Sequence, residues 1–229
     1  MDLQTLQTNV NYRRRDTTES FISNDEVKEY LNEGLRKINS DGNWEFLKTS
    51  AAFSYVDGSM EYALSAVASD NKFPINIFYT KDYEFGIISP EDFRKVSASG
   101  LNVFATDNQD LLVKTSFGSA TLGYHYYSTH MAKTSGGTWQ ASLSAATDEP
   151  LIPVRWRDML VDFAAARCYQ KEEQIDDFTI AYADFRRELD KMRMEYPSKR
   201  RRVLTRIKHS SEVGVRAGGE AIKGNPLGA

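Results

Sequence analysis

The sequence predicts an α+β protein, in which an antiparallel helical bundle carries an inserted antiparallel β domain and an extended C-terminal arm. Three observations support this fold class. Apolar residues recur at helical spacing near both ends of residues 1–197, the stretch between them is rich in aromatic and β-branched residues, and the last 32 residues are basic. We therefore expect four segments, and their boundaries are 1–43 (N-terminal helices of the bundle), 44–146 (inserted β-rich domain), 147–197 (C-terminal helical hairpin) and 198–229 (basic arm).

The composition of the 229 residues suits a chain with a packed core, since 41% are hydrophobic and 27% are charged. The single cysteine, Cys168, excludes an internal disulfide and a cysteine-rich zinc site. No apolar run approaches the roughly 18 residues of a membrane span, and the first residues are more polar than those of a signal peptide. We expect a soluble protein that has no membrane contact and is used without export.

Two helices are expected before residue 43. Apolar residues at spacings of three and four predict a short first helix that stops near the basic run 13–15. Ser23 followed by Glu26 has the form of a capping box, and an apolar stripe then predicts a second helix to about Asn39. Asp41 and Gly42 are expected to end it.

From residue 44 the pattern changes to short apolar and aromatic runs separated by turn pairs such as Asp57-Gly58. This pattern is typical of antiparallel strands. The candidate strands are 46–56, 61–68, 75–80, 84–88, 102–106, 110–116 and 120–130. A connection rich in glycine, serine and threonine is expected over 133–148.

Helical periodicity returns after Pro153 and predicts an antiparallel hairpin that is joined around 171–174 and stopped by Pro197. The first apolar stripe consists of Trp156, Met159, Leu160, Phe163, Ala164 and Tyr169. The second consists of Ile175, Phe178, Tyr182, Phe185, Leu189 and Met192.

The charge is distributed unevenly along the chain. Residues 198–229 contain eight basic and two acidic residues, a net charge of +6, whereas residues 1–197 contain 21 basic and 30 acidic residues, a net charge of −9. Because the last segment has few large apolar residues, we expect it to be flexible when alone and to fold on a partner. The charge asymmetry indicates such a partner.

Catalytic chemistry is not expected, and neither is a metal or cofactor. The five-residue spacing of His125 and His130 places them on opposite faces of a strand, which is poor geometry for one metal. Cys168 lies in an apolar stripe, where a buried structural role is favoured. The carboxylates of 172–177 are interpreted as a solvated turn, and the basic run 13–15 as a solvated loop.

Two parts of the sequence resemble a known family. One is residues 30–38 (YLNEGLRKI), in the capped helix; the other is 147–153 (TDEPLIP), followed by 156–161 (WRDMLV) and 164–167 (AAAR). In this order and spacing they resemble the adaptor, or head-to-tail connector, proteins of tailed bacteriophages. The likeness covers about half of the chain, and the β region departs from the compact, mostly helical members.

The resemblance implies a structural virion protein of the neck, made in the host cytoplasm. Its partners would be the portal protein, the tail or next neck protein, and further copies of itself in a ring, usually of twelve. The ring would extend the DNA channel, and genomic DNA would pass through without sequence-specific binding. The arm would dock on the portal, and we expect its contacts to be Lys199, Arg200, Arg201, Arg202, Val203, Leu204, Arg206, Ile207 and Lys208.

Two other function classes stay open at this point. The β region has aromatic residues suited to stacking on sugar rings or contacting another tail protein, among them Tyr124, Tyr126, Tyr127 and Trp139. Alternatively, the two basic runs 13–15 and 199–202 would contact nucleic acid phosphates, with a strong dependence on salt. For the second run, docking to an acidic protein is favoured over nucleic acid, because no nucleic-acid-binding motif accompanies it.

Overall fold

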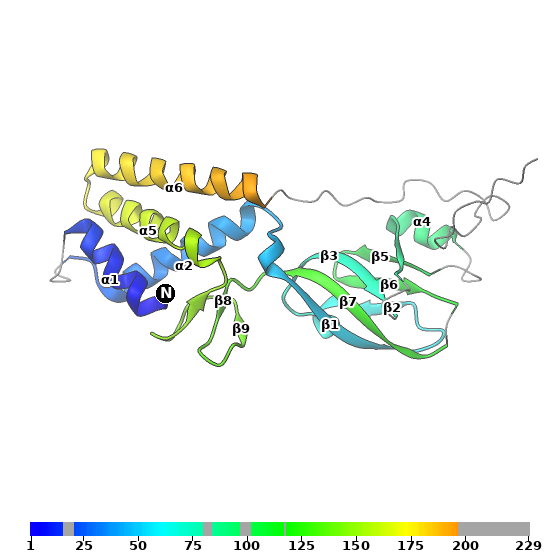
Figure 1. Cartoon of the computed structure of the whole chain (residues 1–229). Coiled ribbons are helices and arrows are strands. Elements are labelled where there is room, and N and C mark those ends of the chain that lie inside the picture. Colours follow the sequence, from blue (N-terminus) through cyan, green and yellow to red (C-terminus); the bar gives the residue numbers. More distant parts are fainter. Residues whose placement is uncertain (16–20, 80–83, 97–101, 117, 197–229) are drawn as a thin grey trace, which may run out of the picture.

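The structure is a computed structural model that describes residues 1–15, 21–79, 84–96, 102–116 and 118–196. Four helices gather at one end of the molecule and most strands at the other (Figure 1), which confirms the expected α+β class. The helices are α1 (Leu3–Arg14), α2 (Asn24–Asp41), α3 (Leu64–Val67), α4 (Pro90–Lys95), α5 (Asp158–Lys171) and α6 (Ile175–Glu195), with the 3-10 helices η1 (Glu45–Leu47) and η2 (Val154–Trp156). The strands are β1 (Lys48–Tyr55), β2 (Glu61–Ala63), β3 (Asn71–Phe78), β4 (Gly86–Ile87), β5 (Val103–Asp107), β6 (Asp110–Lys114), β7 (Ala120–Ser128), β8 (Ala132–Lys133), β9 (Trp139–Gln140) and β10 (Glu149–Pro150). Within these described ranges, every helix is too short or too polar to cross a bilayer.

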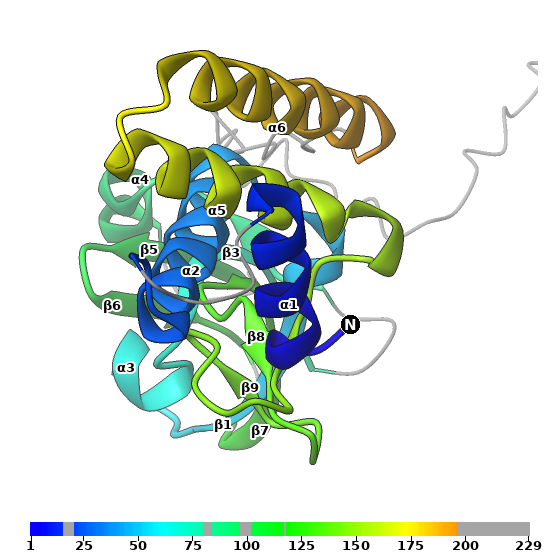
Figure 2. The same cartoon turned by 90° about the vertical axis from the view of Figure 1, so that its left-hand side faces the viewer.

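The helical body consists of α1, α2, α5 and α6, which share one hydrophobic core. Helix α5 is central because it contacts each of the other three helices (Figure 2). The large apolar side chains that this core buries include Leu6, Ile22, Leu31, Leu35, Ile38, Trp44, Leu160, Phe185 and Met192. Burial of such side chains contributes roughly 1.5 to 3 kcal/mol each, so this core is the main source of stability for the helical end.

The small sheet β10-β8-β9 belongs to the same core as the helices. Met131 and Leu143, on either side of its β8–β9 hairpin, are buried among the helical residues. The backbone N–H of Leu3, at the start of α1, donates to the carbonyl of Asp148 at 2.8 Å. The segment 133–148, expected as a plain connection, therefore contains strands and supports the first turn of α1.

Local signals placed α2 correctly. The Ser23 hydroxyl accepts from the backbone N–H of Glu26 at 3.3 Å, and the Glu26 carboxylate accepts from the backbone N–H of Ser23 at 3.2 Å. This confirms the capping box, which satisfies two N–H groups that a helix start leaves without intrahelical partners. The helix runs to Asp41, slightly past the expected end.

Helices α5 and α6 form an antiparallel hairpin, as their apolar stripes predict. The chain reverses at Glu173, which adopts a left-handed backbone conformation with φ of 60°. Phe185, Leu189 and Met192 are buried against α5. Ile175 was expected in this stripe but is 72% exposed, because it is the first residue of α6 and lies at the turn, beyond the packed part of the hairpin.

The β unit consists of two sheets, β1-β7-β3 and β2-β6-β5-β4, with α3 and α4. Their inward faces share a core that includes Phe53, Ile77, Phe104, Val113 and Leu122. The first sheet is antiparallel throughout, but β4 pairs with β5 in parallel, so the second sheet is mixed. The expected antiparallel pairing is wrong at this pair, because α4 lies between the two strands in the chain and returns it to the same end of the sheet.

Two short helices were missed within the β unit. The segment 61–68, expected as one strand, is a strand only to Ala63 and then turns through α3, which buries Val67. The turn signal Ser89-Pro90 begins α4 instead of a plain turn. The Ser89 hydroxyl accepts from the backbone N–H of Asp92 at 3.1 Å, and Pro90 occupies the first helical position, where its missing N–H has no cost.

A half-buried lysine connects the β unit to the helical body. The Lys72 ammonium on β3 donates to the backbone carbonyls of Asn39 and Gly42, at the C-terminal end of α2. The Asn39 amide donates to the carbonyl of Thr129 at 2.9 Å, and the Trp44 indole donates to that of Ile38 at 2.7 Å. Burial lowers the pKa of Lys72. The end of α2 is therefore held from both sides of the junction.

Candidate functional site

The segment 30–38 supplies polar contacts that hold the helical body together. The Asn32 side chain is buried, donates to the Leu143 carbonyl at 3.0 Å and accepts from the Leu143 N–H at 2.8 Å. Glu33 forms a two-bond ion pair with Arg167 of α5. Both polar groups of Asn32 are thus used internally, and Glu33 fixes α2 against α5.

Arg157, from the second segment, is a buried side chain with four hydrogen-bond partners. It is only 5% exposed, and its guanidinium donates to three backbone carbonyls, those of Met1 (2.9 Å), Pro150 (2.9 Å) and Ile152 (3.0 Å). A fourth bond, at 3.2 Å, goes to the carboxylate of Glu149. The planar guanidinium therefore ties the chain start to β10 and α5.

Asp148 organises the loop that precedes β10. One of its carboxylate oxygens accepts from the backbone N–H groups of Ser144 (2.8 Å) and Ala145 (2.7 Å), from the Ser144 hydroxyl and from the Gln140 amide. Burial raises the pKa of Asp148, but these hydrogen bonds outweigh that effect and hold the pKa below its usual value. The two segments that carry the family likeness are thus built into one internal framework.

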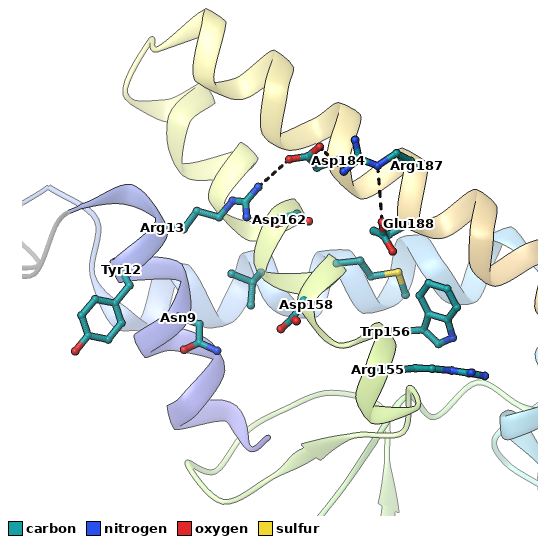
Figure 3. Close-up of a pocket in the computed structure, with 12 residues that line it drawn as sticks. Asn9, Tyr12, Arg13, Arg155, Trp156, Asp158, Asp162, Asp184, Arg187 and Glu188 are labelled. Atoms are coloured by element: carbon teal, nitrogen blue, oxygen red, sulfur yellow. Dashed lines mark hydrogen bonds and ion pairs between the residues drawn. The ribbon is translucent and has the colours of Figure 1, made fainter.

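A groove of the helical body lies between α1, α5 and α6 (Figure 3). Its volume is about 600 Å³. The side chains that line it come from all three helices and from η2, and they are Asn9, Tyr12, Arg13, Arg155, Trp156, Asp158, Met159, Val161, Asp162, Asp184, Arg187 and Glu188. Apolar and charged groups therefore meet in one concave surface, which suits docking of a protein better than chemistry on a small molecule.

Arg13 bridges the three helices inside this groove. Its guanidinium pairs with the carboxylates of Asp162 on α5 at 2.9 Å and Asp184 on α6 at 3.0 Å. Asp162 is 7% exposed. Burial raises its pKa to about 6, against the lowering effect of Arg13, and the nearby carboxylates of Asp184, Asp158 and Glu188 raise it further.

The basic run 13–15 is therefore not a solvated loop, and that interpretation was wrong. Arg13 and Arg14 belong to α1, and the Arg14 side chain is buried and paired with Glu172 in the α5–α6 turn. Glu172 was expected to be one of the solvated carboxylates of 172–177, but it pairs with Arg14 instead. Asp184 lies 171 residues from Arg13 and Glu172 lies 158 residues from Arg14, which is why local pattern did not reveal these contacts.

The other residues considered for reactivity, Cys168 and the two histidines of the β7 region, have the contacts of structural residues. Cys168 is buried, and burial raises the pKa of its thiol to about 12, which leaves it unreactive at neutral pH. The His125 ring contacts Phe78 with centroids 4.5 Å apart, and His130 lies 3.7 Å from the Asp70 carboxylate. Within the ranges that the structure describes, no three histidine, cysteine or acidic side chains gather to hold a metal ion.

The tyrosines of β7 considered for stacking on sugars are buried. Tyr124 is fully buried and its hydroxyl donates to the Asn71 side chain at 2.8 Å, while the Tyr126 hydroxyl donates to Asp70 at 2.6 Å. Tyr127 is also buried, and Trp139 is partly exposed. These rings belong to the packing of the β unit.

The portal-binding residues expected from the sequence, 199–204 and 206–208, lie outside the described residues.

Comparison with protein families gives the decisive finding, because the model of the SU10 adaptor protein family matches residues 1–209. The chain belongs to the SU10 adaptor protein family. Comparison with curated proteins gave no match.

The SU10 adaptor match confirms the family resemblance and extends over the β region as well as both helical segments. The family is one of structural bacteriophage adaptors, which are not enzymes and which act in the virion together with other head and tail proteins. The groove residues Asp162 and Asp184 were not singled out from the sequence, and Arg13 was considered only as part of the basic run 13–15. The one available signal was Asp162, a carboxylate in the middle of an otherwise apolar helix.

Proposed function

We propose that this protein is the head-to-tail adaptor that forms a ring beneath the portal, extends the DNA channel and joins the capsid to the tail. The observation that carries the proposal is the SU10 adaptor family match over residues 1–209. In this proposal the ring contains twelve copies, its distal face receives the tail or the next neck protein, and DNA passes through without sequence-specific contacts.

The proposal divides the work between four segments of the chain. Residues 1–43 and 147–197, together with the segment 131–146 that packs on them, provide a stiff subunit body, since Asn32, Arg157 and Asp148 cross-connect its parts. Residues 48–128, the larger part of 44–146, contribute the β unit, and the basic arm 198–229 docks on the portal. The arm's net charge of +6 suits an acidic portal surface, and Val203, Leu204 and Ile207 would be its apolar anchors.

Binding to the purified portal of the same phage tests this function. We expect the full chain to join the portal as a multi-subunit ring, measured by light scattering of the mixture. A chain truncated after Pro197 should remain unbound. Circular dichroism of the truncated chain checks that its body is folded. Failure of the full chain to bind portal would remove the proposal.

A charge-reversal pair separates the expected portal contacts from the charge of the arm as a whole. Arg201→Glu combined with Arg202→Glu should weaken portal binding strongly. Arg216→Glu combined with Lys223→Glu makes the same change of charge in the distal arm and should weaken it much less. Equal loss in the two variants would assign the effect to total charge, and no loss in either would exclude the arm.

The buried tyrosines disfavour the alternative of a glycan-binding β module, because Tyr124, Tyr126 and Tyr127 present no stacking surface. The nucleic-acid alternative loses one of its two basic runs, since Arg13 and Arg14 are engaged in internal ion pairs.

A further inference from the structure

Among the residues that the structure describes, the two sides of the helical hairpin differ in the charged groups that lack an ion-pair partner. It is the outer helix of the hairpin and packs mainly on α5 (Figure 2). Asp184 and Glu188 on α6 line the groove toward α1. Asp184 pairs with Arg13, and Arg187, which also lines the groove, pairs with both carboxylates. Residues two positions apart on a helix project about 200° from each other, so Arg186 points away from both carboxylates, to the opposite flank.

The second flank faces α2. Arg193 of α6 forms an ion pair with Asp41, the last residue of α2. Arg186 precedes Arg193 by seven residues, about two turns, and lies on the same flank of α6. Lys37 precedes Asp41 by four residues and lies on the same face of α2. Arg186 and Lys37 are exposed, and among the described residues neither has an ion-pair partner.

The first flank also carries an acidic group without a partner. Asp158, at the start of α5, lines the groove, is exposed and has no ion pair with any residue in the described part of the chain. Asp162 lies one turn further along α5, and its buried carboxylate shares Arg13 with Asp184. Asp158 is therefore an acidic group of the groove that the subunit's own cations, within the described ranges, leave unpaired.

We infer that the groove between α1, α5 and α6 of one copy receives the α2–α6 flank of a second copy, with Arg186 and Lys37 directed toward Asp158. The inference rests on the proposed ring function and deepens it by naming the two surfaces that meet. Because the two surfaces are different, the contact is head to tail, and a head-to-tail contact repeated by rotation closes a ring. The unpaired charges favour this pairing, since Asp158 lies on the first surface while Arg186 and Lys37 lie on the second.

A charge swap within one chain tests the contact. In a head-to-tail ring every copy uses both surfaces, so Asp158→Lys alone or Arg186→Glu alone produces like charges at every interface. We expect each single variant to reduce by roughly tenfold the amount of chain that assembles with the portal. The same reduction is expected for self-assembly without portal at high concentration. The double variant Asp158→Lys with Arg186→Glu restores opposite charges and should recover most of the assembly.

Lys95→Glu is the matched control, because Lys95 is an exposed lysine on α4 of the β unit and lies on neither flank. It should assemble as the unmodified chain does. Native mass spectrometry gives the number of copies per complex. Raising the salt concentration should weaken the self-association of the unmodified chain, because the contact joins opposite charges. Circular dichroism checks that each variant is folded.

The outcomes separate the inference from the function on which it rests. Single variants that assemble normally would overturn this interface while leaving portal binding intact. So would a double variant that assembles no better than the single variants. An unmodified chain that neither binds portal nor self-associates would overturn the proposed function and this interface with it.

Discussion

Gly34 of α2 packs directly against Phe163 of α5. A Cβ atom at position 34 would lie 3.0 Å from Phe163 Cδ1 and 3.3 Å from Leu160 Cδ2, closer than ordinary van der Waals contact. The absence of a side chain therefore lets the two helices approach, and this spacing places Glu33 within reach of Arg167.

A β-branched residue at this position should separate the helices. We expect Gly34→Val to lower the free energy of unfolding by roughly 1 to 3 kcal/mol, because its methyl groups overpack a closed contact. Glu29→Val places the same side chain on an exposed position of α2 and should change it by less than about 1 kcal/mol. Urea denaturation of both variants makes the comparison, and equal midpoints would contradict it.

Arg157 should be more sensitive to substitution than its neighbour Arg155. Arg157→Ala removes a buried guanidinium that bonds three carbonyls, and we expect a loss of about 3 kcal/mol or more in unfolding free energy. Arg157→Lys should recover little, because an ammonium cannot reproduce the planar set of donors. Arg155 is exposed, and Arg155→Ala should cost about 1 kcal/mol at most. Thermal and urea unfolding check the ranking, which a full rescue by lysine would refute.

Lys72 should stabilise the junction between the β unit and the helical body. Lys72→Met keeps the apolar stem but leaves the Asn39 and Gly42 carbonyls without their donor, at a cost of roughly 1 to 3 kcal/mol. Amide hydrogen exchange should accelerate in the last turn of α2 more than elsewhere. Lys48→Met, at the more exposed start of β1, is the control. Unchanged exchange in α2 would show that the lysine does not hold this end.

The helices of the body were predictable because their signals are local. Ser23 and Glu26 specify the start of α2 within three residues, and the spacing of Phe185, Leu189 and Met192 identifies the buried side of α6. The mixed pairing of β4 and β5 was not predictable, since a two-residue strand carries too little pattern to show its direction.

The polar framework and the groove could not be predicted for a different physical reason. Asn32 bonds a backbone 111 residues away, and Arg13 pairs with a carboxylate 171 residues away. A charged side chain in a sequence is interpreted as solvated unless its partner is near, so Arg13 and Arg14 were assigned to solvent. Only the folded arrangement of α1, α5 and α6 brings these partners together.

Asp162 should give the helical body a distinct pH dependence. Its pKa is raised from 3.8 to about 6 in the folded chain, mainly by burial, so the folded state holds this proton more tightly than the unfolded state does. Between about pH 4 and pH 6 the unfolded chain has lost the proton while the folded chain still binds it. The contribution of Asp162 to stability therefore falls as pH rises through this window and stays low above it.

Asp162→Asn removes this titration while keeping the side-chain shape, and Arg13 retains Asp184 as a partner. The unfolding free energy of the variant relative to the unmodified chain should rise by roughly 2 to 3 kcal/mol between pH 4 and pH 6.5. Urea unfolding at a series of pH values measures this difference, and carboxyl ¹³C NMR of Asp162 should give a midpoint near 6. A difference that does not change with pH, or a midpoint near 4, would mean that the groove solvates this carboxylate, and the acidic flank would then be fully charged throughout the range.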